Sequence, residues 1–265
     1  MANNSRYAGI ADVLAAEIAD RPAGSRVASE HEIAGRFHVS RAAARAAVQE
    51  LEQRLLVRRV RGAGTFVNRR TDLVLSRRQG PSLHETVRQA GGVARTVVRD
   101  VRLLPLPAAE AGLLERPPGS PAHLLARQSY IDGLLSVLAL IWIPSDVLTE
   151  VGAAVHAVES LDTILRQMGG VEPVRAWCRV SCAVPAPEIA AQLETECGRE
   201  VPLIESLSRD RATGLAVLCS SMWNRPDRTR VVVELDGPWQ PPGPPRDRER
   251  GGGGGPCGGR CPLGG

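Results

Sequence analysis

Two helix start signals close together near the N-terminus constrain the fold of this chain more than any other feature. Ser29 is followed three residues later by Glu32, the spacing of a capping box, in which each side chain binds the other residue's backbone amide. Ser40 precedes an alanine-rich stretch whose apolar residues recur at helical spacing. We therefore predict helices over Glu30–Phe37 and Arg41–Arg54, joined by a short turn.

The segments on either side of this helix pair complete a small domain. Tyr7–Asp20 carries apolar residues at helical spacing and predicts an earlier helix. Two short β-prone runs, Leu56–Val60 and Thr65–Asn68, are separated by Arg61–Gly64, whose two glycines are typical of a hairpin. Three helices followed by a hairpin make a winged helix, which we predict over residues 1–70.

The rest of the chain predicts a second domain between a linker and a tail. Residues 71–80 are polar and weakly patterned, and we assign them to the linker. Residues 81–237 mix many strands with short helices, among them Ser145–Val151 and Leu161–Met168, and this mixture predicts an α+β domain with a mostly antiparallel sheet. Residues 238–265 are rich in proline and glycine and bury too little apolar surface to order themselves.

The charge is distributed unevenly along the chain. Residues 1–70 hold 12 arginines and 7 acidic residues, whereas residues 71–240 hold 17 arginines and 20 acidic residues. The tail from residue 241 holds 4 arginines and 2 acidic residues, so the largest basic excess lies in the predicted winged helix, as binding to phosphate requires. The N-terminus lacks a charged start followed by an apolar stretch, so we expect a cytoplasmic protein with no membrane partner.

Two arginines at the start of the third predicted helix are candidates for reading DNA. Arg41 and Arg45 are one helical turn apart and therefore project from the same face. In the major groove an arginine can donate two hydrogen bonds to guanine, while Ser40 and the first free amides of the helix can bind a phosphate. The alternative is an ordinary solvated basic face, and the neighbouring residues favour DNA contact.

Those neighbours resemble the GntR family of bacterial regulators. The family signature runs from a tyrosine-led helix through a cap and a recognition-helix start to a glycine-bearing wing, and this chain offers Tyr7, Val27–Glu30, Val39–Arg45 and Gly62–Val67 in that order. The resemblance implies binding to double-stranded operator DNA. The DNA contacts that it implies are His31, Ser40, Arg41, Arg45, Gly62, Gly64 and Thr65.

Two positions depart from the GntR signature. Ala28 stands where the family usually has proline, and Ala43 stands where it usually has threonine. One expected hydroxyl contact to DNA is therefore missing. The resemblance thus implies a relaxed or altered operator preference.

The second domain is similar to the UTRA domain of the HutC subfamily, which has a chorismate-lyase-like fold. The matching segments are Pro81–Leu83, Leu125–Ser129, Ser160–Leu161 and Arg225–Arg228. The resemblance implies a pocket for a phosphorylated sugar, a phosphonate or another organic anion. The implied effector ligands are Ser82, Arg127, Ser129, Ser160 and Asn224.

Residue substitutions in the UTRA segments leave the effector open. Ser129 stands where a second arginine is common, and Leu218 and Asn224 stand where a glutamate and a tyrosine often hold a sugar. Arg127 taken alone is nearly as well explained by a structural ion pair as by an effector contact. Asp227 we expect to stabilise a turn.

Together these features predict a repressor that binds DNA as a homodimer and responds to a small molecule. A lyase-like enzyme is one alternative, but no nucleophile, base and orienting group occur together, and the six cysteines lack zinc-site spacing. We therefore expect no catalysis, no metal and no cofactor. A DNA-binding protein whose second domain only dimerises is the other alternative.

Overall fold

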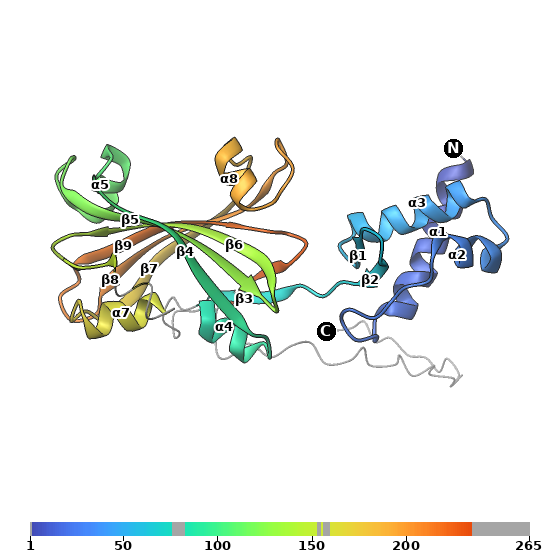
Figure 1. Cartoon of the computed structure of the whole chain (residues 1–265), viewed down its shortest axis with the longest axis horizontal. Helices are drawn as coiled ribbons and strands as arrows, with labels where there is room; N and C mark the ends of the chain where they lie inside the picture. Colours follow the sequence, from blue (N-terminus) through green and yellow to red (C-terminus); the bar gives the residue numbers. More distant parts are fainter. Residues whose placement is uncertain (1, 76–82, 153–154, 156–159, 235–265) are drawn as a thin grey trace, which may run out of the picture. The chain divides into compact units, whose positions relative to one another are not determined.

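The computed structural model describes residues 2–75, 83–152, 155 and 160–234 (Figure 1). The predicted effector ligand Ser82 and the predicted tail at 238–265 lie outside these residues. The helices are α1 (Ala2–Ile18), α2 (Glu30–Phe37), α3 (Arg41–Gln53), α4 (Leu83–Gln89), α5 (Ala108–Leu114), α7 (Leu161–Gln167) and α8 (Pro187–Gln192). The strands are β1 (Val57–Val60), β2 (Gly64–Val67), β3 (Thr71–Leu75), β4 (Ala94–Pro105), β5 (Pro121–Ile131), β6 (Leu134–Pro144), β7 (Pro173–Ala183), β8 (Val201–Asp210), β9 (Ala216–Asn224) and β10 (Thr229–Val233).

The N-terminal helices form as the capping signals predict. The Ser29 hydroxyl accepts from the Glu32 amide at 3.2 Å, and the Glu32 carboxylate accepts from the Ser29 amide at 2.7 Å. These hydrogen bonds satisfy two amides that the first turn of α2 otherwise leaves free. Helix α2 has the predicted bounds, and α3 ends one residue earlier than predicted. Leu14, Ile33 and Leu51 from the three helices are almost fully buried in one common core.

The hairpin that follows is the predicted wing. β1 and β2 pair antiparallel, from Val57 opposite Val67 to Val60 opposite Gly64. Gly62 and Gly64 have φ angles of +77° and +118°, a conformation that other residues adopt only with strain. The tight turn of the wing therefore depends on these two glycines.

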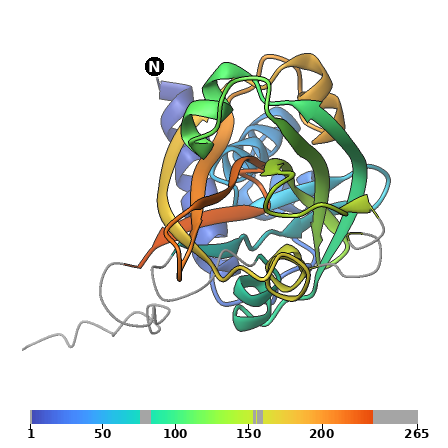
Figure 2. The same ribbon diagram turned by 90° about the vertical axis from the view of Figure 1, so that its left-hand side faces the viewer.

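The C-terminal part is built on one six-stranded sheet with the order β4-β5-β6-β9-β8-β7, in which every pair of neighbours is antiparallel. Helices α5 and α8 cover one face, and α4 and α7 lie against the other (Figures 1 and 2). Leu114 and Leu193 belong to cores on the first face, and Val87 and Leu165 belong to cores on the second. The predicted combination of a winged helix with an α+β domain is confirmed.

Two local predictions differ from the structure. Residues 71–75, predicted as linker, form β3, which pairs in parallel with β10; residues 76–80 lie outside the described part. Thr71 and Asp72 made the segment look polar, although Leu73 and Leu75 are buried at the strand period of two. Ser145–Val151, predicted as a helix, begins with a turn after β6, and Leu148 and Val151 are buried without helical structure.

A half-buried ion pair holds β3 beside β10. Arg230 on β10 donates to both carboxylate oxygens of Asp72 on β3, at 2.6 and 2.8 Å. The Asp72 side chain is 8% exposed, and this contact raises the pKa of Arg230. Two parallel strands alone form a weak sheet, so this charged pair contributes to the docking of both strands.

We expect Asp72→Asn to lower the free energy of unfolding by about 1–2 kcal/mol, because a charged, two-pronged hydrogen bond is lost at a partly buried site. All four tryptophans lie at or after Trp142, so urea denaturation followed by tryptophan fluorescence reports on the C-terminal domain. The control is Asp100→Asn, whose ion pair with Arg102 is exposed on both sides and should change stability by less than about 0.5 kcal/mol. Equal losses in the two variants would contradict a special role for Asp72.

Candidate DNA-binding face and effector pocket

Helix α3 presents two different faces. Ala44, Ala47 and Val48 are buried against the core of the winged helix. Arg41 and Arg45 are exposed on the other side, one turn apart near the N-terminus of the helix. The two predicted base-reading arginines therefore share an exposed face.

Arg45 takes part in a small ion-pair network at the surface. Its Nε lies 3.1 Å from the Glu30 carboxylate, which also lies 3.3 Å from Arg59. The Arg45 side chain is 63% exposed, and exposed ion pairs of this kind contribute little to stability. Arg45 can therefore leave Glu30 for a DNA base at small cost. Within the described part of the chain Arg41 has no ion-pair partner at all.

The other predicted DNA contacts are placed around this face by different elements. Ser40 is the N-cap of α3, and its hydroxyl accepts from the Ala43 amide at 3.2 Å. His31 is exposed in the first turn of α2. Gly62 lies in the turn of the wing, and Thr65 lies on β2, where its carbonyl accepts from Val27.

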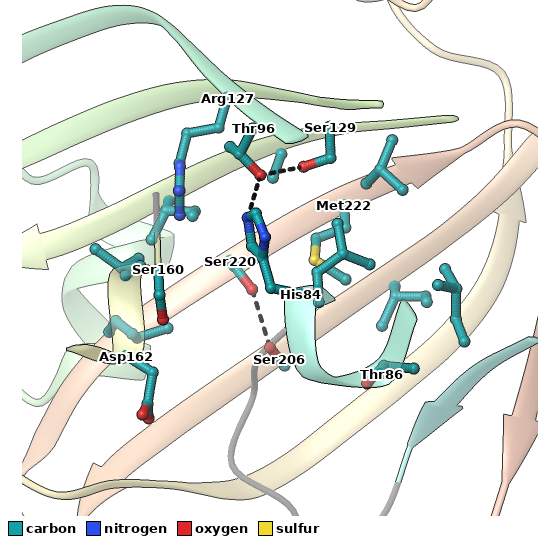
Figure 3. Close-up of a pocket in the computed structure, with 18 of the residues that line it drawn as sticks. His84, Thr86, Thr96, Arg127, Ser129, Ser160, Asp162, Ser206, Ser220 and Met222 are labelled. Carbon is teal, nitrogen blue, oxygen red and sulfur yellow. Dashed lines mark hydrogen bonds between the residues drawn. The ribbon is translucent and has the colours of Figure 1, made fainter. Parts of the chain in front are cut away.

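A second candidate site is a cavity of about 110 Å³ on the face of the sheet that α4 and α7 cover (Figure 3). The central strand β6 supplies an apolar floor through Val137, Ala139 and Ile141. Residues 73–75 of β3 form part of the wall. The polar side chains around the cavity are His84, Thr86, Thr96, Arg127, Ser129, Ser160, Asp162, Arg175, Ser206 and Ser220.

The hydroxyl groups of the cavity form two hydrogen-bonded sets, on different strands of the sheet (Figure 3). Thr96 Oγ1 lies 2.9 Å from His84 Nε2 and 3.1 Å from Ser129 Oγ. On β8 and β9, the hydroxyls of Ser206 and Ser220 lie 2.9 Å apart. The Ser206–Ser220 pair keeps further donor and acceptor capacity because a hydroxyl can donate one bond and accept two. A polar ligand can therefore be bound from this side of the cavity.

The structure brings together three of the predicted effector ligands. Arg127, Ser129 and Ser160 line the cavity, and Ser160 also caps α7 by accepting from the Thr163 amide at 3.3 Å. Asn224 is fully buried and is not part of the lining; its amide group donates to the Met222 carbonyl at 2.9 Å. Asn224 therefore supports the end of β9 rather than facing the cavity.

Seven polar lining residues were missed by the sequence reasoning: His84, Thr86, Thr96, Asp162, Arg175, Ser206 and Ser220. They come from α4, α7 and four different strands, so no local motif joins them. Ser206 and Ser208 on either side of Leu207 are a usable signal, because polar residues on one face of a strand indicate an unfilled space.

The segment Arg225–Arg228 forms a turn, as predicted. Arg225 donates to both carboxylate oxygens of Asp227 at 3.1 Å, and Arg228 lies 3.3 Å from the same carboxylate. Burial alone would raise the pKa of Asp227, but hydrogen bonds from Arg225 and the two positive charges lower it overall. Arg225 also donates to the Glu194 carbonyl at 2.8 Å, which ties the turn to the end of α8.

Comparison with known proteins identifies the family of this chain. The UTRA domain model matches residues 89–230, and the model for bacterial regulatory proteins of the gntR family matches residues 6–67. The chain belongs to the GntR family. This member carries a UTRA domain after its winged helix, and the gntR match describes bacterial regulatory proteins.

Relatives of this GntR regulator agree with that assignment. The HTH-type transcriptional regulator GgaR of Escherichia coli K12 is 27% identical over 188 residues, covering 71% of this chain and 73% of GgaR. The structure of PhnF from Mycobacterium smegmatis matches 86% of this chain and all of PhnF, with a TM-score of 0.59 and 23% identity. The ligand-binding domain of a GntR-family regulator from Bordetella bronchiseptica matches 54% of this chain and 91% of that domain, with a TM-score of 0.51 and 22% identity. The two structural matches show that the fold is shared.

The described residues contain neither a metal-binding cluster nor a membrane-spanning helix. They hold no group of three or more His, Cys, Asp or Glu side chains arranged to bind a metal ion. None of their helices combines the length and apolar character needed to cross a bilayer.

We expect Arg41→Ala to weaken binding to the operator by about 1–3 kcal/mol, or roughly 5- to 150-fold, because one arginine–base contact is lost. Fluorescence anisotropy with operator and scrambled duplexes at one salt concentration measures this change. Arg54→Ala is the control, since Arg54 lies at the opposite end of α3 and pairs with Asp12 and Glu50. Unchanged operator affinity in Arg41→Ala would contradict the assignment of the reading face.

Proposed function

We propose that the protein is a repressor of the HutC subfamily that acts in the cytoplasm, binds a palindromic operator as a homodimer, and changes its operator affinity when a small organic anion occupies the UTRA domain. The observation that carries this proposal is the combination, in one chain, of a winged helix with an exposed arginine face and a polar, cation-lined cavity. GgaR, which resembles this chain, is named as a transcriptional regulator.

DNA reading is assigned to the winged helix. Arg41 and Arg45 are proposed to contact bases, with Ser40 and His31 binding nearby phosphates. The wing approaches the DNA through Gly62, Gly64 and Thr65. The exposure of both arginines supports this assignment, as does the arginine excess of residues 1–70.

An anionic effector is favoured by the chemistry of the cavity. Arg127, 7% exposed, brings a guanidinium to a wall that also carries Ser129 and Ser160. A guanidinium fork with neighbouring hydroxyls matches the oxygens of a phosphoryl or carboxylate group. Leu218 makes one part of the lining apolar, so a phosphorylated sugar is only one of the classes that fit, beside phosphonates and other organic anions.

The connectivity of β3 supports control of DNA binding from this cavity. Residues 73–75 line the cavity, and only residues 68–70 separate β3 from β2 of the wing. A ligand that alters the packing of β3 therefore acts on a strand that continues almost directly into the DNA-binding domain. This route needs a difference in ligand affinity between the two states of the protein, since a ligand shifts an equilibrium only by that difference.

The test is a fluorescence-anisotropy titration against the upstream intergenic DNA and a scrambled duplex at fixed salt. We expect about a thousandfold preference for the native duplex. Among hexose phosphates, alkylphosphonates and dicarboxylates, at least one compound should weaken operator binding by roughly 5- to 150-fold.

Arg41→Ala is the matched control for effector binding. It should bind that compound, measured by calorimetry, as tightly as the natural protein does, because Arg41 lies in the winged helix and not in the cavity. A compound that binds tightly but leaves operator affinity unchanged would refute effector control and favour a domain that only dimerises.

A further inference from the structure

Arg175 on β7 reaches the cavity because of an irregularity in its strand. Arg175 lies opposite Ser208 on β8, but Trp177 lies opposite Leu207, so Ala176 is an extra residue with no partner. In a regular strand Arg175 and Trp177 would share a face. The bulge places Arg175 on the cavity face of the sheet. Trp177 lies on the opposite face, where it packs against the core that contains Leu207.

The Arg175 side chain is half-buried, and its guanidinium has no carboxylate partner among the described residues. Its Nε is fully buried and has no hydrogen-bond partner within the described part of the chain, and burial lowers the pKa of the group. Arg116 and Arg230, by contrast, each bind a carboxylate. A buried donor without an acceptor lowers stability, and a bound molecule that supplies an acceptor would remove this cost.

The cavity itself supplies no free carboxylate to Arg175. Asp162 is the acidic residue among its described lining residues, and both Asp162 oxygens accept from Arg166, at 2.8 and 3.4 Å. The remaining polar groups of the lining are hydroxyls, a histidine ring and the guanidinium of Arg127. An oxyanion entering the cavity would therefore provide the acceptors that the guanidinium lacks.

We propose that Arg175 is an effector ligand that binds an oxyanion, either phosphoryl or carboxylate, of the bound molecule and selects anionic over neutral effectors. This inference rests on the proposed effector cavity and adds a ligand that no motif in the sequence revealed. The bulge at Ala176 is the local feature that directs this side chain toward the cavity.

Thermal unfolding of the full-length protein, without DNA, tests the assignment. Inorganic phosphate, malonate and acetate serve as probes, with sodium chloride at equal ionic strength as the reference. We expect phosphate or malonate to raise the midpoint of the natural protein beyond the chloride reference, and the stronger of the two identifies the acidic group. In Arg175→Met the probe should bind at least tenfold more weakly.

The same variant gives a second readout that a structural role would not produce. Without a probe, Arg175→Met should unfold at a temperature higher by roughly 2–4 °C, because a half-buried charge whose Nε has no partner has been replaced by an apolar chain of similar length. Arg175→Lys keeps the charge but loses the fork, and should bind the probe with intermediate strength. The matched control is Arg179→Met on the same strand, where the side chain is 67% exposed and pairs with Glu205; it should keep the full response to the probe.

Three outcomes would overturn the proposal. A lower midpoint in Arg175→Met together with an unchanged response to the probe would make Arg175 structural. If the methionine variant does not fold, Arg175→Gln, which keeps a polar head group, takes its place. A probe-induced rise in the midpoint as large as in the natural protein would then reject the assignment. No response of the natural protein to any probe would also reject an oxyanion site. Because DNA is absent, these results are distinguishable from failure of operator control, which the anisotropy titration measures.

Discussion

The strand register of the six-stranded sheet is the constraint on which the effector site depends. Side chains alternate between the two faces of a strand, so a shift of one residue would move a whole row to the opposite face. In the observed register Thr96 lies opposite Ser129, and Ser206 lies opposite Ser220. These pairs bring hydroxyls from distant parts of the chain into one cavity. A bulge at Ala176 then shifts the register of β7 against β8 by one residue and places Arg175 on the cavity face.

Much of the winged helix could be predicted because its signals are local. Ser29 with Glu32, and Ser40 before an alanine-rich stretch, act within one helical turn, and the glycines of the wing act within one hairpin. Each of these elements is determined by residues close to it in the sequence. Neighbouring residues in the sequence were therefore enough to locate the proposed reading face.

The effector cavity was predicted only in part because it is assembled from long-range pairs. Arg127 and Ser160 were found through motifs, whereas Arg175 and Ser206 carry no motif and depend on which strands become neighbours. Short helices also escaped prediction: α4 and α5 have seven residues each, too few to show a clear period. Asn224 stands where the family often has a tyrosine, yet its side chain is used in a hydrogen bond at the end of β9.

The arginines separate into two groups that explain how one residue type serves both structure and function. All 33 cationic side chains of the chain are arginines, so the difference comes from their surroundings. Arg230 binds a carboxylate in a partly buried pair that joins β10 to β3, and Arg225 binds the Asp227 carboxylate within one turn. Arg41 in the winged helix and Arg175 in the UTRA domain have no such carboxylate within the described residues. An unpaired guanidinium costs little stability when it is exposed, but a buried N–H without an acceptor costs more. Because the Nε of Arg175 is buried, Arg175 is the stronger indication of a missing partner.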